Sequence, residues 1–198
     1  MKDHFEKRAE NWDSSTLRTT TPQAIADAIK KKIILKKDMK IMDFGVGTGL
    51  LGFKIAEEVK EVYGVDMSPS MLQKLEEKNT PELHIKAICQ DIVKEPLTLK
   101  FNGIISSMTL HHVEDLSSFF RSIYQNLHNG SFMAIADLES EDGTFHSDNA
   151  GVYHFGFDKN ELCKIVKKCG FRDVVLEKVT TISKPQKDFG VFLLTAIK

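Results

Sequence analysis

A chain of 198 residues with 41% hydrophobic and 28% charged residues has the composition of a folded globular protein and excludes a disordered one. Its formal net charge of -1 excludes a general attraction to nucleic acid or anionic membranes. Three cysteines, a charged first stretch and the lack of any apolar run near the roughly 18 residues of a membrane span predict a cytoplasmic protein with reduced thiols. We expect residues 1–198 to form a single domain.

Strands and helices are predicted to alternate through the first two thirds of the chain. The first helix is expected to begin at Thr21–Pro22, where a hydroxyl cap precedes an early proline. The expected strands are 41–43, 62–66, 84–89, 103–108 and 132–136, and the helices between them begin near residues 53, 68 and 115. Gly130 is expected to end the last of these helices. Mostly continuous apolar strands separated by helices predict a parallel sheet that is covered on both faces.

The end of the chain departs from this alternation. Asp158–Glu161 forms a capping box for a helix that should run to Cys169. Two strand-like segments then follow, 173–182 and 190–197, with only the polar stretch 183–188 between them. A connection this short predicts an antiparallel hairpin at the edge of the sheet.

An acid and three glycines at alternating positions follow the first predicted strand. Gly47 to Gly52 fits the pattern G-x-G-x-x-G, and Asp66 lies about 20 residues beyond its start, which is typical of dinucleotide binding. The alternative counts from Asp43 through Gly45 and Gly47 to Gly49. We favour it because the first strand is expected to stop at Asp43, whereas an unpaired carboxylate inside a buried strand would be costly.

Counted from Asp43, the segment resembles motif I of the class I S-adenosylmethionine-dependent methyltransferases. The resemblance runs from about Thr16 onward: Asp66 ends the second strand, 90–92 follow the third, 106–113 follow the fourth, and the final helix and hairpin resemble the family's ending. It implies a Rossmann-like α/β fold with a seven-stranded, mostly parallel sheet, helices on both faces and an antiparallel C-terminal hairpin. It also implies S-adenosylmethionine as cofactor and S-adenosylhomocysteine as product.

The resemblance assigns cofactor binding to residues that follow the predicted strands. Gly45, Gly47 and Gly49 would let the backbone approach the methionine moiety and the ribose. Asp66 would accept hydrogen bonds from the ribose hydroxyls, unless it only precedes the next helix. Asp91 would accept from the adenine amino group, unless it is a simple turn residue. The full expected set is Trp12, Arg18, Asp43, Gly45, Gly47, Gly49, Asp66, Met67, Asp91, Ile92, Ser107 and Met108.

The first 20 residues are expected to form a lid, because an N-terminal helix covers the cofactor in related enzymes. Within this lid segment, Trp12 would pack against the site and Arg18 would bind the methionine carboxylate. A tryptophan that anchors the core and an arginine on the surface are the open alternatives.

Residues 138–157 carry aromatic side chains and histidines after the fifth predicted strand, and we expect them to form the acceptor-site loop. His154 and His112 are the candidate bases if the acceptor must lose a proton, because histidine ordinarily titrates near neutral pH. Asp137, His111, His112, His146 and His154 could all lie near one rim of the site. No metal site is expected from them, because they lack the spacing of a metal-binding motif.

The acceptor is predicted to be a small molecule, since the chain is nearly neutral and carries no added RNA-binding module. A methyltransferase acting on a tRNA side chain stays open as an alternative. A nicotinamide-dependent oxidoreductase is a second alternative, although the Tyr-x-x-x-Lys pair of the short-chain type is missing after Tyr124 and Tyr153. A non-catalytic cofactor-binding module is the third. The sequence gives no oligomeric state.

Overall fold

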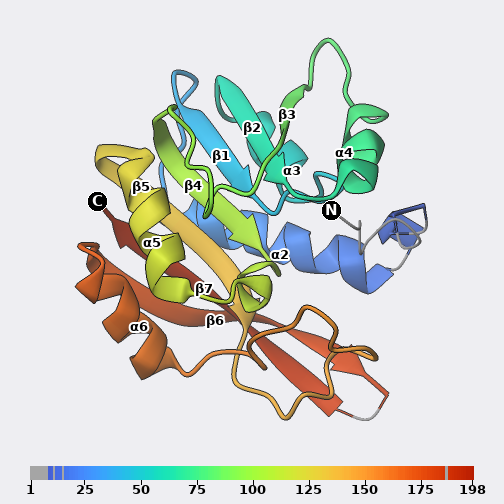
Figure 1. The fold of residues 1–198 in the computed structure, drawn as a ribbon. Coiled ribbons are helices and arrows are strands. Elements are labelled where there is room, and N and C mark those ends of the chain that lie inside the picture. The colour runs from blue at the N-terminus through green and yellow to red at the C-terminus, as the bar shows by residue number, and fades with distance from the viewer. Residues whose placement is uncertain (1–8, 11, 15, 186) are drawn as a thin grey trace.

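A seven-stranded sheet forms the centre of the molecule (Figure 1). The computed structural model describes residues 9–198 except 11, 15 and 186, and it leaves out the side chains of 14 and 16–18. The strands are β1 (Lys40–Phe44), β2 (Glu61–Asp66), β3 (Ile85–Cys89), β4 (Phe101–Ser107), β5 (Leu127–Leu138), β6 (Arg172–Lys184) and β7 (Lys187–Ile197). The helices are η1 (Trp12–Ser14), α2 (Thr16–Lys32), α3 (Gly52–Ala56), α4 (Pro69–Glu76), η2 (Leu110–His112), α5 (Leu116–Gln125) and α6 (Lys159–Lys168).

The strand order is β3-β2-β1-β4-β5-β7-β6, and β1 to β5 are parallel to one another. β7 pairs antiparallel with β5, and β6 pairs antiparallel with β7. This confirms the predicted fold class, including the C-terminal hairpin. The chain order reverses between β1 and β4, and open α/β sheets bind ligands at the carboxyl ends of strands next to such a switch point.

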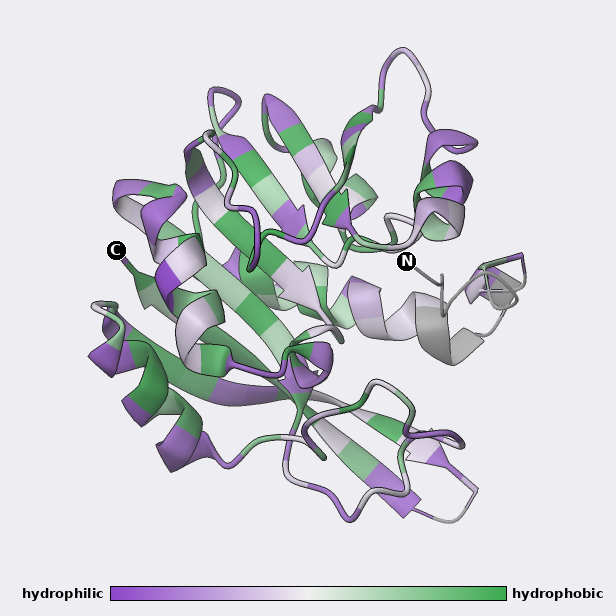
Figure 2. Cartoon of the chain, viewed as in Figure 1, coloured by the Kyte–Doolittle hydropathy of each residue, from purple (hydrophilic) through white to green (hydrophobic). Residues whose placement is uncertain are grey.

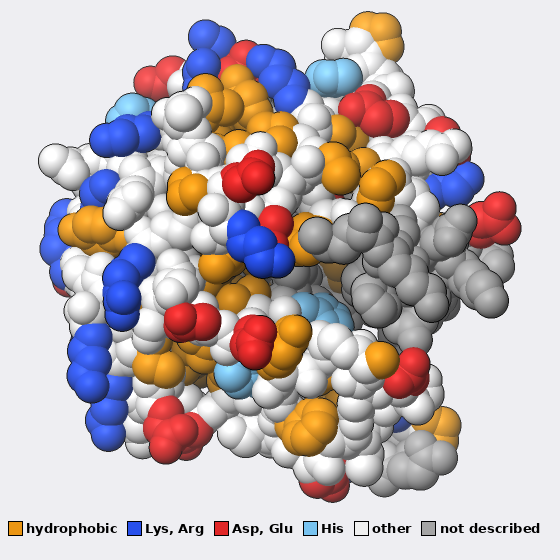
Figure 3. All heavy atoms as spheres, in the orientation of Figure 1, with side chains coloured by type: hydrophobic (Ala, Val, Ile, Leu, Met, Phe, Trp, Pro, Cys, Tyr) orange, Lys and Arg blue, Asp and Glu red, His pale blue; other side chains and the backbone are white. Residues whose placement is uncertain are grey.

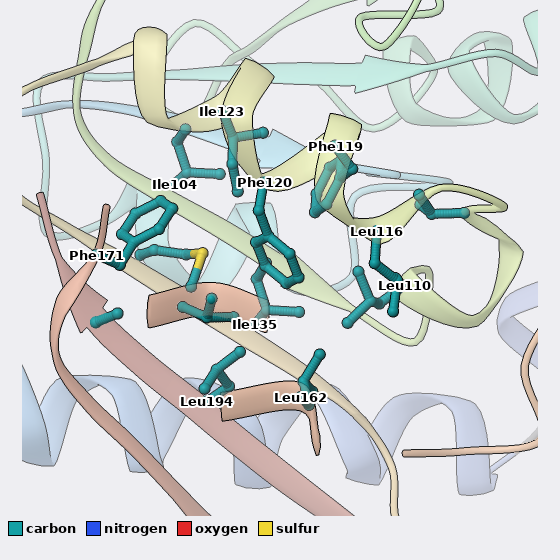
Figure 4. Packing of buried hydrophobic residues seen from close by; sticks show 14 of the residues in the cluster. Ile104, Leu110, Leu116, Phe119, Phe120, Ile123, Ile135, Leu162, Phe171 and Leu194 are labelled. Atoms are coloured by element: carbon teal, nitrogen blue, oxygen red, sulfur yellow. The ribbon is translucent and has the colours of Figure 1, made fainter. Parts of the chain in front are cut away.

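Two hydrophobic cores cover the two faces of the sheet. One core places Phe119, Phe120 and Ile123 of α5 against sheet residues such as Ile104 and Ile135 (Figure 4), and α6 joins it. The other core places α2, α3 and α4 against the opposite face. In Figure 2 the central strands are the most hydrophobic part of the ribbon, whereas the outer helices alternate between hydrophilic and hydrophobic residues. This pattern is expected for parallel strands that are buried on both faces.

Two predicted helix boundaries were wrong, the start of α2 and the end of α5. α2 begins at Thr16 and passes through Pro22, which lacks one N–H donor but has a φ angle that a helix tolerates. α5 ends at Gln125, well before Gly130, and Asn126 fixes this end because its side-chain amide donates to the carbonyls of Leu97 and Leu99 at 2.7 and 2.8 Å. β5 therefore starts earlier than expected, at Leu127.

Gly103 in β4 is required by close packing. A Cβ at this position would lie 2.2 Å from Cζ of the buried Phe132 ring on the neighbouring strand. We expect Gly103→Ala to lower the free energy of unfolding by about 2 kcal/mol, because overpacking a well-filled core costs roughly 1–3 kcal/mol. Urea unfolding measures this loss, and adding Phe132→Leu should recover part of it. Equal stability of Gly103→Ala and wild type would contradict the packing argument.

None of the helices in the described part of the chain is long and apolar enough to cross a membrane. Cys89, Cys163 and Cys169 are all free thiols, and Cys89 is exposed.

Candidate active site

The loop between β1 and α3 has the geometry that its glycines predict. Gly45, Gly47 and Gly49 have φ angles of 65°, 54° and 84°, which is the left-handed region that favours glycine. The N–H groups of Gly45 and Val46 donate to the Val65 carbonyl at 2.8 and 3.1 Å, so the loop is attached to the end of β2. The loop is therefore a fixed backbone structure at the carboxyl edge of the sheet.

The three glycines differ in what surrounds them. A Cβ on Gly45 would lie 2.1 Å from Cγ2 of Thr109, and a Cβ on Gly49 would lie 2.7 Å from the Phe53 ring. A Cβ on Gly47 would meet no described atom within 4 Å. Protein packing thus explains two of the glycines, whereas Gly47 leaves open space above the backbone. Open space against bare backbone fits a ligand that lies directly on the loop.

Asp43 lies inside β1 and is 1% exposed, so the expectation that the strand stops at this residue was wrong by one position. Burial, and then the nearby charge of Asp66, raise the pKa of Asp43 well above its ordinary value, although a backbone hydrogen bond from Gly52 opposes this shift. Oδ2 of Asp43 is buried and has no hydrogen-bond partner among the described residues. An orphaned carboxylate oxygen below the glycine loop is a second feature that fits a ligand with donor groups.

We expect Asp43→Asn to stabilise the folded protein at neutral pH. The folded state binds the Asp43 proton more tightly than the unfolded state does, so its stability falls as the pH rises from the ordinary carboxyl pKa through the raised folded pKa. Asn carries no charge and can still accept the Gly52 N–H through its side-chain oxygen, so the free energy of unfolding at pH 7 should rise. Urea unfolding at pH 7 and near pH 4 measures this gain, which should shrink at the lower pH; a variant less stable than wild type at pH 7 would refute it.

Asp66 connects the glycine loop to the start of α4. Its Oδ2 accepts the Gly47 N–H at 2.8 Å, and its Oδ1 accepts the Ser68 N–H at 2.9 Å. Ser68 in turn caps α4 by accepting the Met71 N–H at 3.2 Å. Met67, between the acid and the cap, is 49% exposed, which is unusual for a large apolar side chain. The structure thus brings Asp66 to Gly47 and leaves the neighbouring Met67 exposed.

Asp91 lies after β3, where the sequence placed it, but it has local partners. Its Oδ1 accepts from the N–H groups of Val93 and Lys94 at 3.2 and 3.3 Å, and its Oδ2 lies 3.2 Å from Nζ of Lys94. These contacts are those of a turn residue. Ile92 is fully buried, and its carbonyl accepts the Ser122 hydroxyl at 2.9 Å. Both roles toward adenine remain proposals.

The residues that follow β4 contact the glycine loop. Ser107 is the last residue of the strand, and Met108 follows with φ 57°, a left-handed angle that is uncommon outside glycine. The Met108 N–H donates to the Ala136 carbonyl at 2.9 Å, and the Thr109 hydroxyl donates to the Gly45 carbonyl at 3.3 Å. Strained backbone of this kind is concentrated at functional sites, so the outlier supports a functional position for Met108.

The N-terminal segment contacts the glycine loop through Asp13. Oδ1 of Asp13 accepts the hydroxyl of Thr48 at 2.6 Å, and Oδ2 pairs with Nζ of Lys78 at 2.7 Å. Trp12 is half-buried in η1. Arg18 belongs to α2, but its side chain lies outside the described residues. Sequence reasoning missed Asp13, which carries no motif.

Three histidine rings lie together beyond the loop. The ring centroids of His111 and His112 are 4.2 Å apart, and the His146 ring lies 4.9 Å from His111 and 5.9 Å from His112. Nδ1 of His111 lies 2.7 Å from Oδ1 of Asp137, and both side chains are almost fully buried. In Figure 3 histidine side chains reach the surface near the middle of the face shown. Among the described residues, no group of three or more His, Cys, Asp and Glu side chains is arranged to hold a metal ion.

The two histidines proposed as bases from the sequence both contact backbone carbonyls. Nε2 of His154 lies 2.9 Å from the Val113 carbonyl, and Nδ1 of His112 lies 2.7 Å from the Gly151 carbonyl. The N–H groups of Tyr153 and His154 also donate to the His111 carbonyl at 3.0 and 3.3 Å. These bonds hold part of the segment 138–157 against η2. The observed contacts of His154 and His112 are therefore structural ones.

His146 makes the stability of the fold depend on pH. Burial, and then the charges of His111, His112 and Lys184, lower its pKa from 6.5 to about 4, although Asp137 opposes this shift. Between these two values the unfolded state binds the proton and the folded state does not, so stability should fall as the pH drops from about 6.5 to about 4. One such proton gives a slope of at most about 1.4 kcal/mol per pH unit.

His146→Gln should flatten this slope in urea unfolding curves recorded across the same pH range. The exposed His128, substituted in the same way, provides the matched control. An equally steep slope in His146→Gln would show that the acid sensitivity arises elsewhere.

Comparisons with known proteins agree with this architecture. A family model described as a methyltransferase domain matches residues 35–170, more than half of the chain. An uncharacterised methyltransferase of Schizosaccharomyces pombe is 26% identical over 174 residues, covering 79% of this chain and 60% of that protein. Phosphoethanolamine N-methyltransferase 1 of Triticum aestivum is 29% identical over 156 residues, covering 75% of this chain and 31% of that protein. The chain thus spans less than two thirds of the length of these two relatives.

A solved structure, that of Haemonchus contortus phosphoethanolamine N-methyltransferase 2 in complex with S-adenosyl-L-methionine, has the same fold. It superposes with a TM-score of 0.74 at 19% identity, covering 96% of this chain and 56% of that one.

Proposed function

We propose that this chain, which belongs to the class I S-adenosylmethionine-dependent methyltransferases, transfers a methyl group from S-adenosylmethionine to a small-molecule acceptor. The observation that carries the proposal is the open space at Gly47, where the loop has a left-handed backbone, is hydrogen-bonded to the end of β2 and is bordered by Asp66. Bound S-adenosylmethionine supplies a methyl group on a sulfonium, which is a good electrophile. The protein then has to hold the two reactants in line and exclude water.

The residues at the carboxyl edge fit the groups of this cofactor. Gly47 offers bare backbone, and Asp66 offers carboxylate oxygens for the two vicinal ribose hydroxyls. Asp43 offers a buried oxygen that lacks a protein partner in the described structure and suits a cationic or hydroxyl donor. Asp91 with Ile92 would serve the adenine, and Ser107 with Met108 would face the methionine moiety.

Two segments would exclude water from the transfer. The contact of Asp13 with Thr48 supports a lid role for residues 1–20, with Trp12 and Arg18 as its proposed cofactor contacts. The hydrogen bonds of Tyr153 and His154 to the His111 carbonyl support an acceptor-site role for residues 138–157. We propose that both segments belong with the rest of the chain to a single methyltransferase domain.

A small acceptor is supported by the surroundings of this loop. Tyr153 and Phe155 expose 54% and 46% of their surface there, as aromatic side chains at the rim of a ligand site do. On the face shown in Figure 3, acidic side chains are interspersed with the Lys and Arg side chains, and no continuous basic patch is visible, which does not favour a long polyanion. The similarity to a phosphoethanolamine N-methyltransferase also supports a small acceptor.

Two measurements test this function. A thermal shift panel should show stabilisation by S-adenosylmethionine and S-adenosylhomocysteine but not by NAD or NADP, because a ligand that binds only the folded state raises its stability. Tritiated methyl donor is then incubated with a low-molecular-weight metabolite extract and, separately, with total tRNA. Label in the metabolite fraction alone is expected; label in the tRNA alone would replace the small-molecule acceptor with RNA.

A further inference from the structure

His111 and Asp137 form a buried pair that the proposed function does not use. His111 follows β4 in η2, and Asp137 lies near the end of β5; they are 1% and 0% exposed. Oδ1 of Asp137 lies 2.7 Å from Nδ1 of His111 and accepts the Leu138 N–H at 2.7 Å, while Oδ2 accepts the His111 N–H at 3.2 Å. The carboxylate is therefore fixed from both sides and holds the imidazole in one orientation.

This pairing determines which nitrogen of His111 is free. A carboxylate can only accept hydrogen bonds, so Nδ1 carries the proton and donates it to Asp137. In the neutral ring Nε2 then carries a lone pair. Nε2 is buried and has no hydrogen-bond partner among the described residues, and the same is true of Nε2 of His146. Two such orphaned atoms on neighbouring rings call for an explanation, because buried polar atoms are normally paired.

The position of the His111–Asp137 pair suggests what the two unpaired nitrogen atoms could serve. Thr109, two residues before His111, contacts the glycine loop through Gly45. Asp137 lies at the carboxyl end of β5, the strand next to β4. The pair is thus next to the cofactor loop on the side of the segment 138–157, which is bonded to the His111 carbonyl. If residues 138–157 form the acceptor site, as proposed above, the His111 ring belongs to the wall of that site on the side of the cofactor loop.

We propose that Nε2 of His111, oriented by Asp137, takes the proton of a hydroxyl acceptor during methyl transfer. The acceptor oxygen forms a bond to the methyl carbon, the C–S bond breaks with its electron pair going to sulfur, and the O–H proton goes to Nε2. The products are the methyl ether, S-adenosylhomocysteine and an imidazolium ion that Asp137 stabilises. This inference rests on the proposed function and adds the base and the acceptor class to it.

The groups around His111 favour a hydroxyl over an amine. His112 lies on the same element, and His146 comes from the segment 138–157. Nζ of Lys184 in β6 lies 4.1 Å from the ring centroid of Phe145, the residue before His146. Asp137 is the facing acid, and it is already occupied by three hydrogen bonds. An amine is a cation at neutral pH, since its ordinary pKa is about 10.4, and would be repelled by Lys184. A phenol-type hydroxyl is neutral there and needs a base.

Nitrogen NMR tests the base without knowledge of the acceptor. Protein labelled with ¹⁵N-histidine and saturated with S-adenosylhomocysteine is titrated from about pH 9 to about pH 5, with His111 assigned by comparison with His111→Gln. We expect the Nδ1–H tautomer, with Nε2 unprotonated, at the high-pH end of the titration. The Nε2–H tautomer there would make His111 a structural residue and overturn the proposal.

Turnover of the acceptor recovered from the metabolite extract provides the second test. His111→Gln should lower turnover by about 10²- to 10⁴-fold while the dissociation constant of S-adenosylhomocysteine changes less than about threefold, since the base acts only in the transfer. The exposed control His128→Gln should retain wild-type turnover. An N-methylated or S-methylated product, or undiminished turnover in His111→Gln, would overturn the proposal. Failure of S-adenosylhomocysteine to bind at all would instead count against the proposed function. The dissociation constant of S-adenosylhomocysteine therefore separates the two failures.

Discussion

Asp66→Ala is expected to weaken binding of S-adenosylhomocysteine by at least about a hundredfold. The carboxylate holds the Gly47 N–H and the Ser68 N–H, and we propose that it also accepts from the ribose hydroxyls. Hydrogen bonds to a charged group are worth about 1.5–3 kcal/mol each, so the loss of two to the ribose corresponds to roughly a hundredfold or more in affinity. Isothermal titration calorimetry measures the change.

Asp115→Ala is the matched control for this substitution. Asp115 also precedes a helix and accepts a backbone N–H, that of Ser118 at 3.0 Å, but it lies at the start of α5. Both variants should lose some stability, because each loses an acid at a helix entry, and such caps are worth about 1 kcal/mol. Only Asp66→Ala should lose affinity. If the two variants bind S-adenosylhomocysteine equally well, Asp66 serves only to hold the backbone before α4.

The fold could be predicted from the sequence because its signals are local. The parallel strands are short apolar runs bounded by acids or glycines, and the hairpin of β6 and β7 follows from two strand-like segments with no helix between them. The order of the strands also agrees with the family resemblance, which the match over residues 35–170 confirms. Neither inference required a contact between distant residues.

The wrong predictions concern places where tertiary contacts override local preference. Asp43 was expected at the end of its strand, because burying a carboxylate is unfavourable. Instead, β1 continues to Phe44 and Asp43 is buried, with its pKa raised by the burial. Gly130 was expected to end α5, yet the side-chain contacts of Asn126 end the helix first. A single sequence shows neither the burial of Asp43 nor the two carbonyls that Asn126 reaches.

The candidate site shows the same division. The spacing predicted a glycine loop at Gly45, Gly47 and Gly49, and all three residues have the positive φ angles that favour glycine; their contact with the cofactor stays a prediction. The sequence also placed His111 and Asp137 near one rim, because one follows the fourth predicted strand and the other ends the fifth. It did not show that the two side chains form a hydrogen bond, since 26 positions separate them and no motif connects them.

Gly47→Ala separates a need for positive φ from a need for open space. At φ 54° an added Cβ meets no described atom within 4 Å, so the fold should bear only the left-handed penalty of about 1–2 kcal/mol. The methyl group would occupy the space in which we place the cofactor, so affinity for S-adenosylhomocysteine should fall at least about tenfold, a loss of about 1.4 kcal/mol.

Gly130→Ala is the control for this substitution, because Gly130 has φ 80° and equally open surroundings, far along the chain from the loop. Urea unfolding should show similar losses of stability in the two variants, while calorimetry should show weakened binding in Gly47→Ala alone. Equal affinity in both would mean that Gly47 serves only the turn, and the ligand would then have to lie elsewhere along the carboxyl edge of the sheet.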